Sequence, residues 1–306
     1  WSRSAGKKIA FMGKEYTVEE TTPDSFAGID IALFAGGAAS KEFAPHAVKA
    51  GAIVVDNSSA FRMDPEVPLV VPEVNPEAIK NHKGIIANPN CSTIIMVMGL
   101  KPLYDLAKIR RIVVSTYQAV SGAGKEGMVE LEMQVAALSE GKEAEANILP
   151  VSSLPKHYPI AFNLIPQIDV FMDNLYTKEE MKMINETKKI MGDDTLRITA
   201  TTVRVPVYRS HAESVNVEFE SAVSLEDARK ALAAFPGVIL RDNPAEQEYP
   251  MPLFTSDKTD VEVGRLRLDE STENALNFWI CGDQIRKGAA LNTLQIAEYM
   301  IAHELV

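Results

Sequence analysis

The feature that most constrains the fold is the charge-free stretch from Gly84 to Leu100, which a short polar turn divides in two. Undivided, it would come near membrane-spanning length. Asn88-Pro89-Asn90 separates a strand-sized run, Gly84 to Ala87, from a helix-sized run, Ile94 to Leu100. The stretch therefore predicts a strand, a turn and a helix, and not a membrane segment.

Upstream of this stretch, the chain alternates strand and helix patterns. Ile29 to Ala35 is a buried-strand run, Gly36-Gly37 predicts a tight turn, Lys41 to Ala50 is helical, and Ala52 to Val55 is a second strand. Units of this kind build parallel sheets with helices on both faces, and ligands bind at the carboxyl ends of the strands. We expect an α/β, doubly wound, Rossmann-like domain.

The later part of the chain changes character. Strand patterns cover Arg111 to Ala119, Arg197 to Val207, His211 to Glu220, Val238 to Arg241, Val261 to Leu268 and Leu276 to Cys281, and helical patterns cover Glu126 to Leu138, Thr177 to Met191, Ser224 to Phe235 and Gly288 to Glu304. Thr177 and Glu180 form a capping box. These patterns predict a second, α+β domain, and we expect the last helix to return to the first one.

Composition narrows the class of function. The chain has 306 residues, enough for two domains, and a formal net charge of -11, which argues against nucleic acid and anionic membranes as partners. Its two cysteines, Cys91 and Cys281, lie far apart and suggest a reducing, cytoplasmic setting, although a single bridge between them stays open.

Cys91 is the candidate nucleophile. Unpaired backbone N–H groups and the helix dipole at the start of a helix favour a thiolate, so the pKa of a thiol placed there should fall. The alternative is a small buried hydrophobic residue, which is the common role of a free cysteine.

Other polar residues are ambiguous when taken one at a time. His211 and Arg204 are expected on adjoining strands at one strand-turn-strand junction. They could supply a general acid/base and a carboxylate clamp, or be ordinary surface residues. Glu179 and Lys182 share a helix face, as many solvated ion pairs do. Gln118 ends a strand, where its amide could orient a carbonyl or simply be solvated.

Four motifs in order resemble those of the aspartate-β-semialdehyde dehydrogenase family. They are Asn-Pro-Asn-Cys-Ser-Thr at 88–93, Tyr-Gln-Ala-Val-Ser-Gly-Ala-Gly at 117–124, Lys-His-Tyr-Pro-Ile-Ala-Phe-Asn at 156–163, and Ala-Glu-Ser-Val after His211. The likeness extends from about Ser2 to Ala297, and its spacing is similar to the Gram-positive bacterial branch.

The resemblance implies a homodimeric enzyme, with a tetramer as the alternative, and no metal. It would use NADP to interconvert L-4-aspartyl phosphate and L-aspartate 4-semialdehyde, with phosphate as the other small-molecule product. Such an enzyme serves the biosynthesis of lysine (through diaminopimelate), threonine and methionine. The second domain would then be a catalytic and dimerisation domain with a mixed sheet.

The resemblance also implies a role for each candidate residue. The catalytic residues would be Cys91 as the nucleophile that forms a thioester, His211 as the acid/base, and Gln118 as the group that positions the acyl intermediate. The substrate-binding residues would be Arg204 for the α-carboxylate, Glu179 for the ammonium group, Lys182 with Arg62 for the phosphoryl group, and Asn90 in support of the phosphate site.

Cofactor contacts are implied at eight positions. Ser2, Arg3 and Ser4 would meet the 2′-phosphate of NADP, Gly36, Gly37 and Asn57 would line the cofactor groove, and Gly122 and Asn292 would approach the nicotinamide.

The sequence departs from the family at its beginning. Family members open with a strand and a glycine-rich loop that holds the pyrophosphate at a helix N-terminus, and no such loop occurs here. We expect a fragment that lacks this beginning, with native truncation as the alternative. The expected domains are a dinucleotide-binding domain, residues 1–91 with 287–306, and a catalytic and dimerisation domain, residues 92–286.

Two other functions stay open. N-acetyl-γ-glutamyl-phosphate reductase shares the reaction type, and recognition of a free amine by Glu179 would distinguish the two. A truncated, non-catalytic dimeric scaffold is the alternative from a different class.

Overall fold

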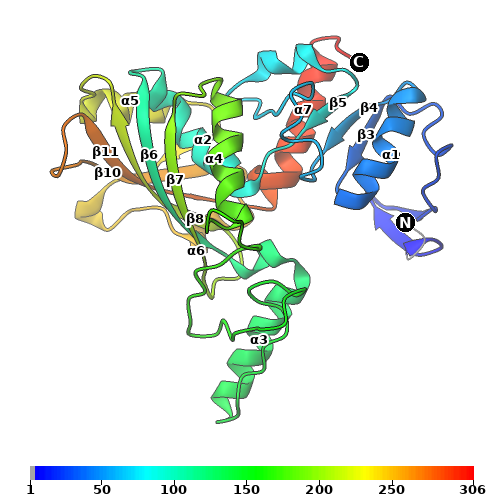
Figure 1. The fold of residues 1–306 in the computed structure, drawn as a ribbon, viewed down its shortest axis with the longest axis horizontal. Coiled ribbons are helices and arrows are strands. Elements are labelled where there is room, and N and C mark those ends of the chain that lie inside the picture. The colour runs from blue at the N-terminus through cyan, green and yellow to red at the C-terminus, as the bar shows by residue number, and fades with distance from the viewer. Residues whose placement is uncertain (1–3) are drawn as a thin grey trace. The chain divides into compact units, whose positions relative to one another are not determined.

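The computed structural model describes residues 4–306 and consists of two compact units (Figure 1). Of the described residues, 4–70, 76–88 and 293–306 belong to the first unit, and 71–75 and 89–292 belong to the second. The predicted α/β fold, with a parallel sheet in one part and a mixed sheet in the other, is confirmed.

The first unit contains a three-stranded parallel sheet in the order β3-β4-β5, formed by β3 (Ile31–Phe34), β4 (Ile53–Asp56) and β5 (Ile85–Ala87). Helix α1 (Gly37–Lys49) contributes Phe43, Ala44 and Ala47 to one hydrophobic cluster, and α7 (Leu291–Ala302) contributes Ile296 and Met300 to another. The last helix therefore packs in the first unit, as predicted. The 3-10 helix η2 (Pro76–Asn81) also belongs to this unit.

A hairpin of β1 (Lys8–Phe11) and β2 (Lys14–Thr17) was not anticipated from the sequence. Met12 and Gly13, at its turn, have φ of 47° and 76°, the left-handed backbone of a tight hairpin turn. All eight strand residues are exposed. The hairpin therefore lacks the alternation of buried and exposed positions that usually reveals a strand.

The second unit contains a six-stranded mixed sheet in the order β7-β6-β8-β11-β10-β9. Its strands are β6 (Ile109–Gln118), β7 (Arg197–Arg204), β8 (His211–Phe219), β9 (Val238–Leu240), β10 (Val261–Leu268) and β11 (Ala275–Gly282). β7 is parallel to β6 and β9 is parallel to β10, whereas the other pairs are antiparallel. The last two strands, β10 and β11, form one of the antiparallel pairs.

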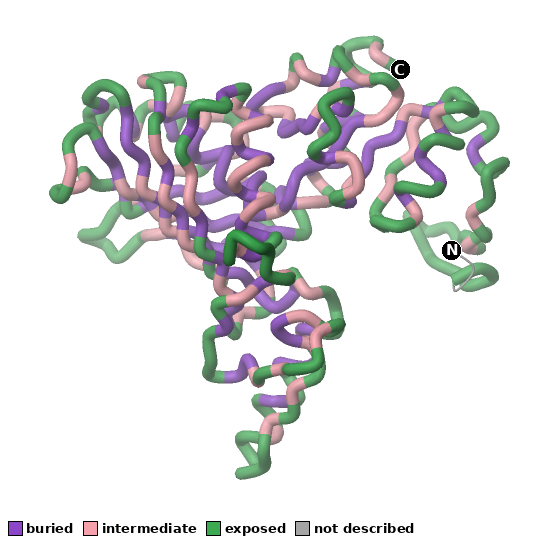
Figure 2. The backbone as a smooth tube through the Cα atoms, viewed as in Figure 1, coloured by how far each residue is buried: buried purple, intermediate pink, exposed green. Residues whose placement is uncertain are grey.

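Four described helices pack against this sheet. They are α2 (Cys91–Tyr104) on β6, β10 and β11, α4 (Lys178–Met191) on β7, α5 (Leu225–Ala234) on β9 and β10, and α6 (Pro252–Thr255) on β11. α2 is buried along most of its length (Figure 2). The predicted capping box is confirmed, because Thr177 Oγ1 accepts from the Glu180 N–H at 3.2 Å and Glu180 Oε2 accepts from the Thr177 N–H at 2.7 Å.

Several boundaries differ from prediction. α1 begins at Gly37 rather than Lys41, so the expected glycine turn is the start of the helix. The final helical pattern divides into a π-helical segment, η5 (Arg286–Ala290), and α7. The remaining helical elements are η3 (Val120–Ala123), α3 (Lys125–Ser139) and η4 (Pro244–Glu246).

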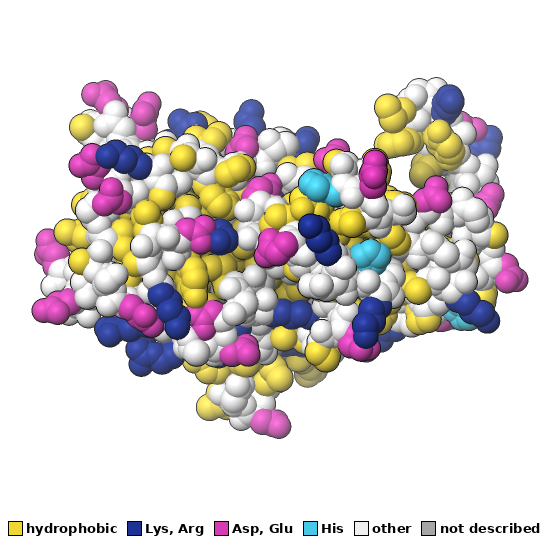
Figure 3. All heavy atoms as spheres, turned by 90° about the horizontal axis from the view of Figure 1, so that it is seen from above, with side chains coloured by type: hydrophobic (Ala, Val, Ile, Leu, Met, Phe, Trp, Pro, Cys, Tyr) yellow, Lys and Arg dark blue, Asp and Glu magenta, His cyan; other side chains and the backbone are white. Residues whose placement is uncertain are grey.

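Within residues 4–306, no helix has the length and apolar character needed to cross a bilayer. Both cysteines are free thiols, so the single disulfide left open by the sequence does not form. Acidic and basic side chains are interspersed over the face seen in Figure 3.

Strand β8 buries a carboxyl group without a partner. Glu213 is fully buried, and neither of its carboxylate oxygens accepts a hydrogen bond from any described residue. Burial raises the pKa of this carboxyl well above its ordinary value, so the folded protein keeps it protonated.

We expect the free energy of unfolding of the Glu213→Gln variant to increase relative to that of the wild type as pH rises. Above the ordinary carboxyl pKa the unfolded wild-type chain loses a proton that the folded chain keeps, so its free energy of unfolding falls with pH. The difference between variant and wild type should therefore grow as pH rises above the ordinary carboxyl pKa, by at most about 1.4 kcal/mol per pH unit. Urea unfolding measures it, with Glu298→Gln at an exposed position of α7 as the control. A difference independent of pH would contradict the assignment.

Candidate active site

Cys91 is the first residue of α2, as the sequence predicted. Asn90 caps the helix, and its side-chain Oδ1 accepts from the backbone N–H groups of Ser92 at 3.0 Å and Thr93 at 3.2 Å. The thiol is partly exposed. It therefore lies at the positive end of a buried helix, where a thiolate is favoured.

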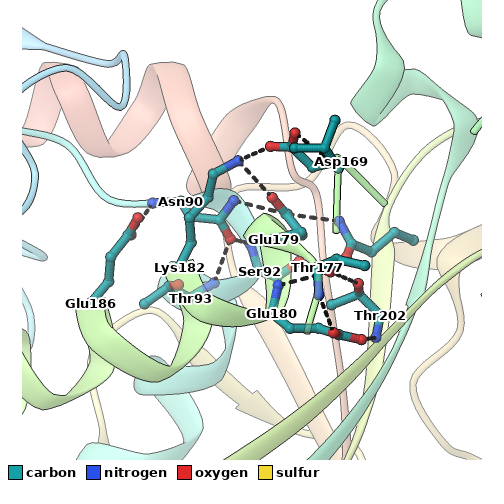
Figure 4. A network of polar contacts seen from close by, with 12 residues as sticks. Asn90, Ser92, Thr93, Asp169, Thr177, Glu179, Glu180, Lys182, Glu186 and Thr202 are labelled. Atoms are coloured by element: carbon teal, nitrogen blue, oxygen red, sulfur yellow. Dashed lines mark hydrogen bonds and ion pairs between the residues drawn. The ribbon is translucent and has the colours of Figure 1, made fainter. Parts of the chain in front are cut away.

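The side chain of Asn90 also reaches the substrate-binding candidates on α4. Its Nδ2 donates to Glu179 Oε1 at 2.9 Å, and the other carboxylate oxygen of Glu179 accepts from Lys182 Nζ at 3.0 Å (Figure 4). Lys182 also binds Asp169 Oδ2 at 2.9 Å. The structure thus joins the cap of α2, which carries the candidate nucleophile, to a pair of opposite charges in which Glu179 is buried and Lys182 is partly exposed.

The ionisation of this pair follows from its contacts. Burial would raise the pKa of the Glu179 carboxyl, but the Lys182 ammonium and hydrogen bonds from Asn90, Lys182 and Gln118 lower it to about 2. Burial opposes the charge on Lys182, and Glu179 with Asp169 outweighs it, so its pKa is raised. Both groups are charged at neutral pH, and Glu179 is only 5% exposed. Glu179 therefore does not belong to a fully solvated ion pair of the kind that helix spacing alone suggested.

Glu186 is a site residue that the sequence reasoning missed. Its Oε2 accepts from the Asn90 backbone N–H at 2.6 Å, and the residue is 1% exposed. Glu179, Lys182 and Glu186 recur on one face of α4 at helical spacing, which was the available signal. Carboxylates on one face of α4 therefore bind both the side-chain amide and the backbone N–H of Asn90.

The end of β6 brings three predicted residues together. Gln118 Nε2 donates to Glu179 Oε1 at 3.3 Å. The next residue, Ala119, binds two of the candidates through its peptide groups, since its N–H donates to His211 Nδ1 at 3.1 Å and its C=O accepts from Arg204 Nη1 at 2.7 Å. One short segment of backbone fixes an imidazole and a guanidinium.

One expectation about this arrangement is wrong. The sequence suggested that Arg204 and His211 lie on adjoining strands, but β6 separates β7 from β8 in the sheet. Gln118 pairs with Arg204 in the register of β6 and β7. The two side chains meet because both turn toward the end of β6, and not because their strands pair.

The hydrogen bond from Ala119 determines the tautomer of His211. Nδ1 accepts a hydrogen bond, so the neutral ring carries its proton on Nε2, which has no partner among the described residues. Burial and the Arg204 guanidinium lower the pKa of His211 to about 3, although Glu179 acts in the opposite direction. At neutral pH His211 therefore presents an uncharged N–H donor.

A strained residue precedes His211. Ser210 is fully buried with φ of 69°, and its N–H donates to Gln284 Oε1 at 2.8 Å. The Gln284 amide in turn donates to Ser121 Oγ. A non-glycine residue in this conformation costs about 1–3 kcal/mol, which the surroundings must offset. Gln284 and Ser121, which the sequence analysis did not identify, hold the backbone that orients the imidazole.

Gly122 leaves room for these side chains. A Cβ added to Gly122 would lie 2.7 Å from Arg204 Nη1 and 3.2 Å from His211 Cε1. A side chain at this position would therefore shift one or both of the two candidates.

The candidates in the first unit form a cluster of their own. Arg62 donates through Nε to the Asn88 carbonyl at 2.9 Å and through Nη2 to the Asn57 carbonyl at 3.1 Å. Asn88 Nδ2 donates to Asn57 Oδ1 at 2.6 Å. The buried Asp56 accepts from Ser40 Oγ at 2.6 Å and from Ser58 Oγ at 2.7 Å. The sequence analysis did not identify Asp56, Ser40 or Ser58.

The remaining candidates lie elsewhere. Gly36 caps α1 and Gly37 begins it, Asn292 is buried near the start of α7, and Ser4 is exposed. Ser2 and Arg3 lie outside the described residues. Cys281 is fully buried, and burial raises the pKa of its thiol, as expected for a core residue.

Comparison with known proteins identifies relatives along the whole chain. Residues 100–287 match the family described as "Semialdehyde dehydrogenase, dimerisation domain", and residues 1–82 match "Semialdehyde dehydrogenase, NAD binding domain". The aspartate-semialdehyde dehydrogenase of Aquifex aeolicus is 54% identical over 99% of this chain and 89% of its own length. That of Bacillus subtilis is 53% identical over 99% and 88%.

Solved structures of aspartate-semialdehyde dehydrogenases are also similar to this chain. Aspartate semialdehyde dehydrogenase II from Vibrio cholerae, in complex with ASA, has a TM-score of 0.93 and 46% identity, with 99% of this chain and 88% of that chain covered. The enzyme from Candida albicans, solved with NADP, has a TM-score of 0.77 and 25% identity, with 100% and 90% covered.

We expect Gly122→Ala to lower catalytic turnover by about 100-fold, the scale of a 1 Å misplacement. The new methyl group would displace Arg204 or His211, whereas the sheet and its helices are untouched. Steady-state kinetics and the unfolding temperature are measured together. Turnover close to that of the wild type would show that the two side chains tolerate the shift.

Proposed function

Since the chain belongs to the aspartate-semialdehyde dehydrogenase family, we propose how its own residues carry out the reaction of that family. The enzyme is an oxidoreductase of amino-acid biosynthesis that reductively dephosphorylates L-4-aspartyl phosphate to L-aspartate 4-semialdehyde with a nicotinamide cofactor. The proposal adds NADP as that cofactor and a thioester on Cys91 as the intermediate.

One observation carries the proposal. Cys91 is the first residue of α2, and the side chain that caps this helix is bonded to Glu179, which is buried and paired with Lys182. A zwitterionic phosphorylated substrate needs both signs of charge next to the nucleophile, and this arrangement provides them.

Substrate recognition follows from the charges. Arg204 would bind the α-carboxylate through its planar guanidinium, Glu179 the ammonium group, and Lys182 with Arg62 the phosphoryl group. Asn90 would support the phosphate site, and Gln118 would position the acyl group. Recognition of a free amine by Glu179 favours aspartyl phosphate over the N-acetylated substrate of N-acetyl-γ-glutamyl-phosphate reductase, which is the less favoured alternative.

The thiolate of Cys91 would attack the acyl carbon and expel phosphate, which leaves a thioester. When bound, the nicotinamide supplies the hydride that reduces this thioester. His211 would then donate its Nε2–H to the carbonyl oxygen as that oxygen gains negative charge. Collapse of the tetrahedral species re-forms the carbonyl and releases the Cys91 thiolate, so no net proton leaves His211.

The start of α1 suits an anionic cofactor. Its cap is Gly36, which has no side chain to occupy the first N–H groups of the helix, and the first turn carries no acidic residue. A Cβ at Gly37 would meet no described atom within 4 Å. Free backbone N–H groups at a helix N-terminus bind phosphates. We assign Gly36, Gly37 and Asn57 to this role.

The other cofactor contacts rest on the family resemblance. They are Ser2, Arg3 and Ser4 for the 2′-phosphate and Gly122 and Asn292 for the nicotinamide. In the same way, residues 1–91 with 287–306 would bind the cofactor, and residues 92–286 would carry catalysis and dimerisation.

A dimerisation domain is present. We propose that the assembly is a cytoplasmic homodimer, with a tetramer as the alternative.

The test is acylation in the absence of NADPH. Mixed with L-4-aspartyl phosphate, the wild-type chain should release one phosphate per active site in a rapid burst and carry the acyl group on Cys91, which mass spectrometry of the peptides locates. Cys91→Ser should show no burst and should lose at least about 1000-fold in turnover, with little change in unfolding temperature.

Cys281→Ala is the matched control for the other thiol, and it should keep the burst. Turnover retained in Cys91→Ser, or a burst lost only in Cys281→Ala, would contradict the assignment of the nucleophile.

A further inference from the structure

The backbone that leads into His211 is held by a buried carboxylate to which the mechanism above assigns no role. This carboxylate belongs to Asp283, whose side chain is fully buried and which directly follows the end of β11 at Gly282. Gly282 pairs with His211 in the register of β11 and β8, and this is the last pair of the two strands. Beyond it, the two chain segments are joined by side chains and no longer by the sheet.

Asp283 binds the segment before His211 through Arg209. Arg209 Nε lies 2.7 Å from Asp283 Oδ2, and Arg209 Nη1 lies 2.6 Å from Asp257 Oδ1. The Asp257 N–H donates to the same Asp283 oxygen at 2.6 Å. One carboxylate oxygen thus holds a guanidinium and a peptide group from two separate loops.

The other oxygen of Asp283 holds the turn that packs on the proposed nucleophile. Oδ1 accepts from the N–H groups of Ile285 at 2.9 Å and Arg286 at 3.0 Å, at the start of η5. Within η5, a Cβ added to Gly288 would lie 3.0 Å from Cys91 Cβ. Asp283 is therefore bonded both to the segment that leads into β8 and to the turn beside Cys91.

Each of the two loops held at Oδ2 contains a strained residue. Ser210, which follows Arg209, has φ of 69°, and Asp257 has φ of 64°, in the left-handed region that non-glycine residues rarely adopt. Such conformations persist only where the surroundings over-determine them, and they cluster at functional sites. The contacts of Asp283 provide this restraint, because they fix the residue before Ser210 and the peptide of Asp257.

The bend at Ser210 acts on the imidazole itself. Burial and the Arg204 guanidinium lower the pKa of His211, whereas Glu179 and a backbone contact from Ser210 act in the opposite direction. The ring is thus held between the Ala119 N–H on one side and the Ser210 peptide on the other. A shift of the Ser210 peptide would move the imidazole with it.

We propose that Arg209 and Asp283 are positioning residues for the reduction half of the reaction, because their ion pair holds the bend at Ser210 from which His211 presents its Nε2–H. The inference rests on the proposed function, in which His211 donates to the carbonyl oxygen only as the hydride arrives. Neither member of the pair has to touch substrate or cofactor. Loss of the pair should slow reduction of the thioester and leave its formation nearly unchanged.

The variant that tests this role is Arg209→Met. It removes the guanidinium but leaves Asp283 with three N–H donors, so the buried carboxylate keeps its partners and the fold should survive. Acylation is read from the phosphate burst without NADPH, and reduction from a single turnover of NADPH oxidation after acylation. We expect a burst within about twofold of wild type and reduction slowed about 10- to 100-fold.

The matched control is Arg229→Met. Arg229 is a partly exposed arginine of α5 that pairs with the buried side chain of Asp242, which is the same kind of pair as Arg209 with Asp283. It should lower the unfolding temperature to a similar extent and change neither half-reaction. Equal slowing of reduction in the control would reveal a general effect of lost stability and would overturn the assignment.

Ser210→Gly tests the bend directly. Glycine adopts a positive φ without the cost that serine bears, so the bend then needs less restraint. Added to Arg209→Met, Ser210→Gly should recover most of the lost rate of reduction. A double variant as slow as Arg209→Met would show that the pair does not act through the bend.

Equal losses in the two half-reactions of Arg209→Met, or normal reduction in that variant, would also overturn the role of the pair. Absence of the burst in the wild-type enzyme would instead overturn the proposed function, so the two failures are distinguishable.

Discussion

The active site depends on the side chain of one residue, Asn90. Its carbonyl oxygen caps α2 and so fixes the position of Cys91, while its amide nitrogen donates to Glu179 and its backbone N–H donates to Glu186. α2, which carries the proposed nucleophile, and α4, which carries the proposed substrate-binding charges, are thereby joined through one residue. Because Glu179 is buried and ionised, its charge-assisted hydrogen bond from Asn90 is stronger than the equivalent bond in water.

Electrostatics in the second unit favour a negative nucleophile and an uncharged imidazole. The Arg204 guanidinium and the N-terminus of α2 are both positive, and Arg204 also helps to lower the pKa of His211. The Ala119 peptide holds both side chains in place through hydrogen bonds. Preorganised donors of this kind stabilise developing charge at no cost of reorganisation during the reaction.

Much of the fold and of the candidate site could be predicted from the sequence, and the remaining features could not, for physical reasons. The turn at Asn88 to Thr93, the capping box at Thr177 and the parallel sheet all rest on local patterns, and they were predicted correctly. Glu186 was missed because a carboxylate on a helix face looks the same whether it is solvated or bonded to a distant N–H group. The order of β7, β6 and β8 is set by long-range pairing, which strand patterns do not encode.

The most direct test is a double-mutant cycle between Asn90 and Glu179, measured as kcat/KM for L-aspartate 4-semialdehyde. Asn90→Ser keeps a cap for α2 but cannot reach Glu179, and Glu179→Gln keeps the shape of its partner. If the two residues act as one unit, the double variant should be little worse than the poorer single variant, with an interaction free energy of about 1–3 kcal/mol. Losses that simply multiply would show that the nucleophile and the substrate-binding carboxylate work independently.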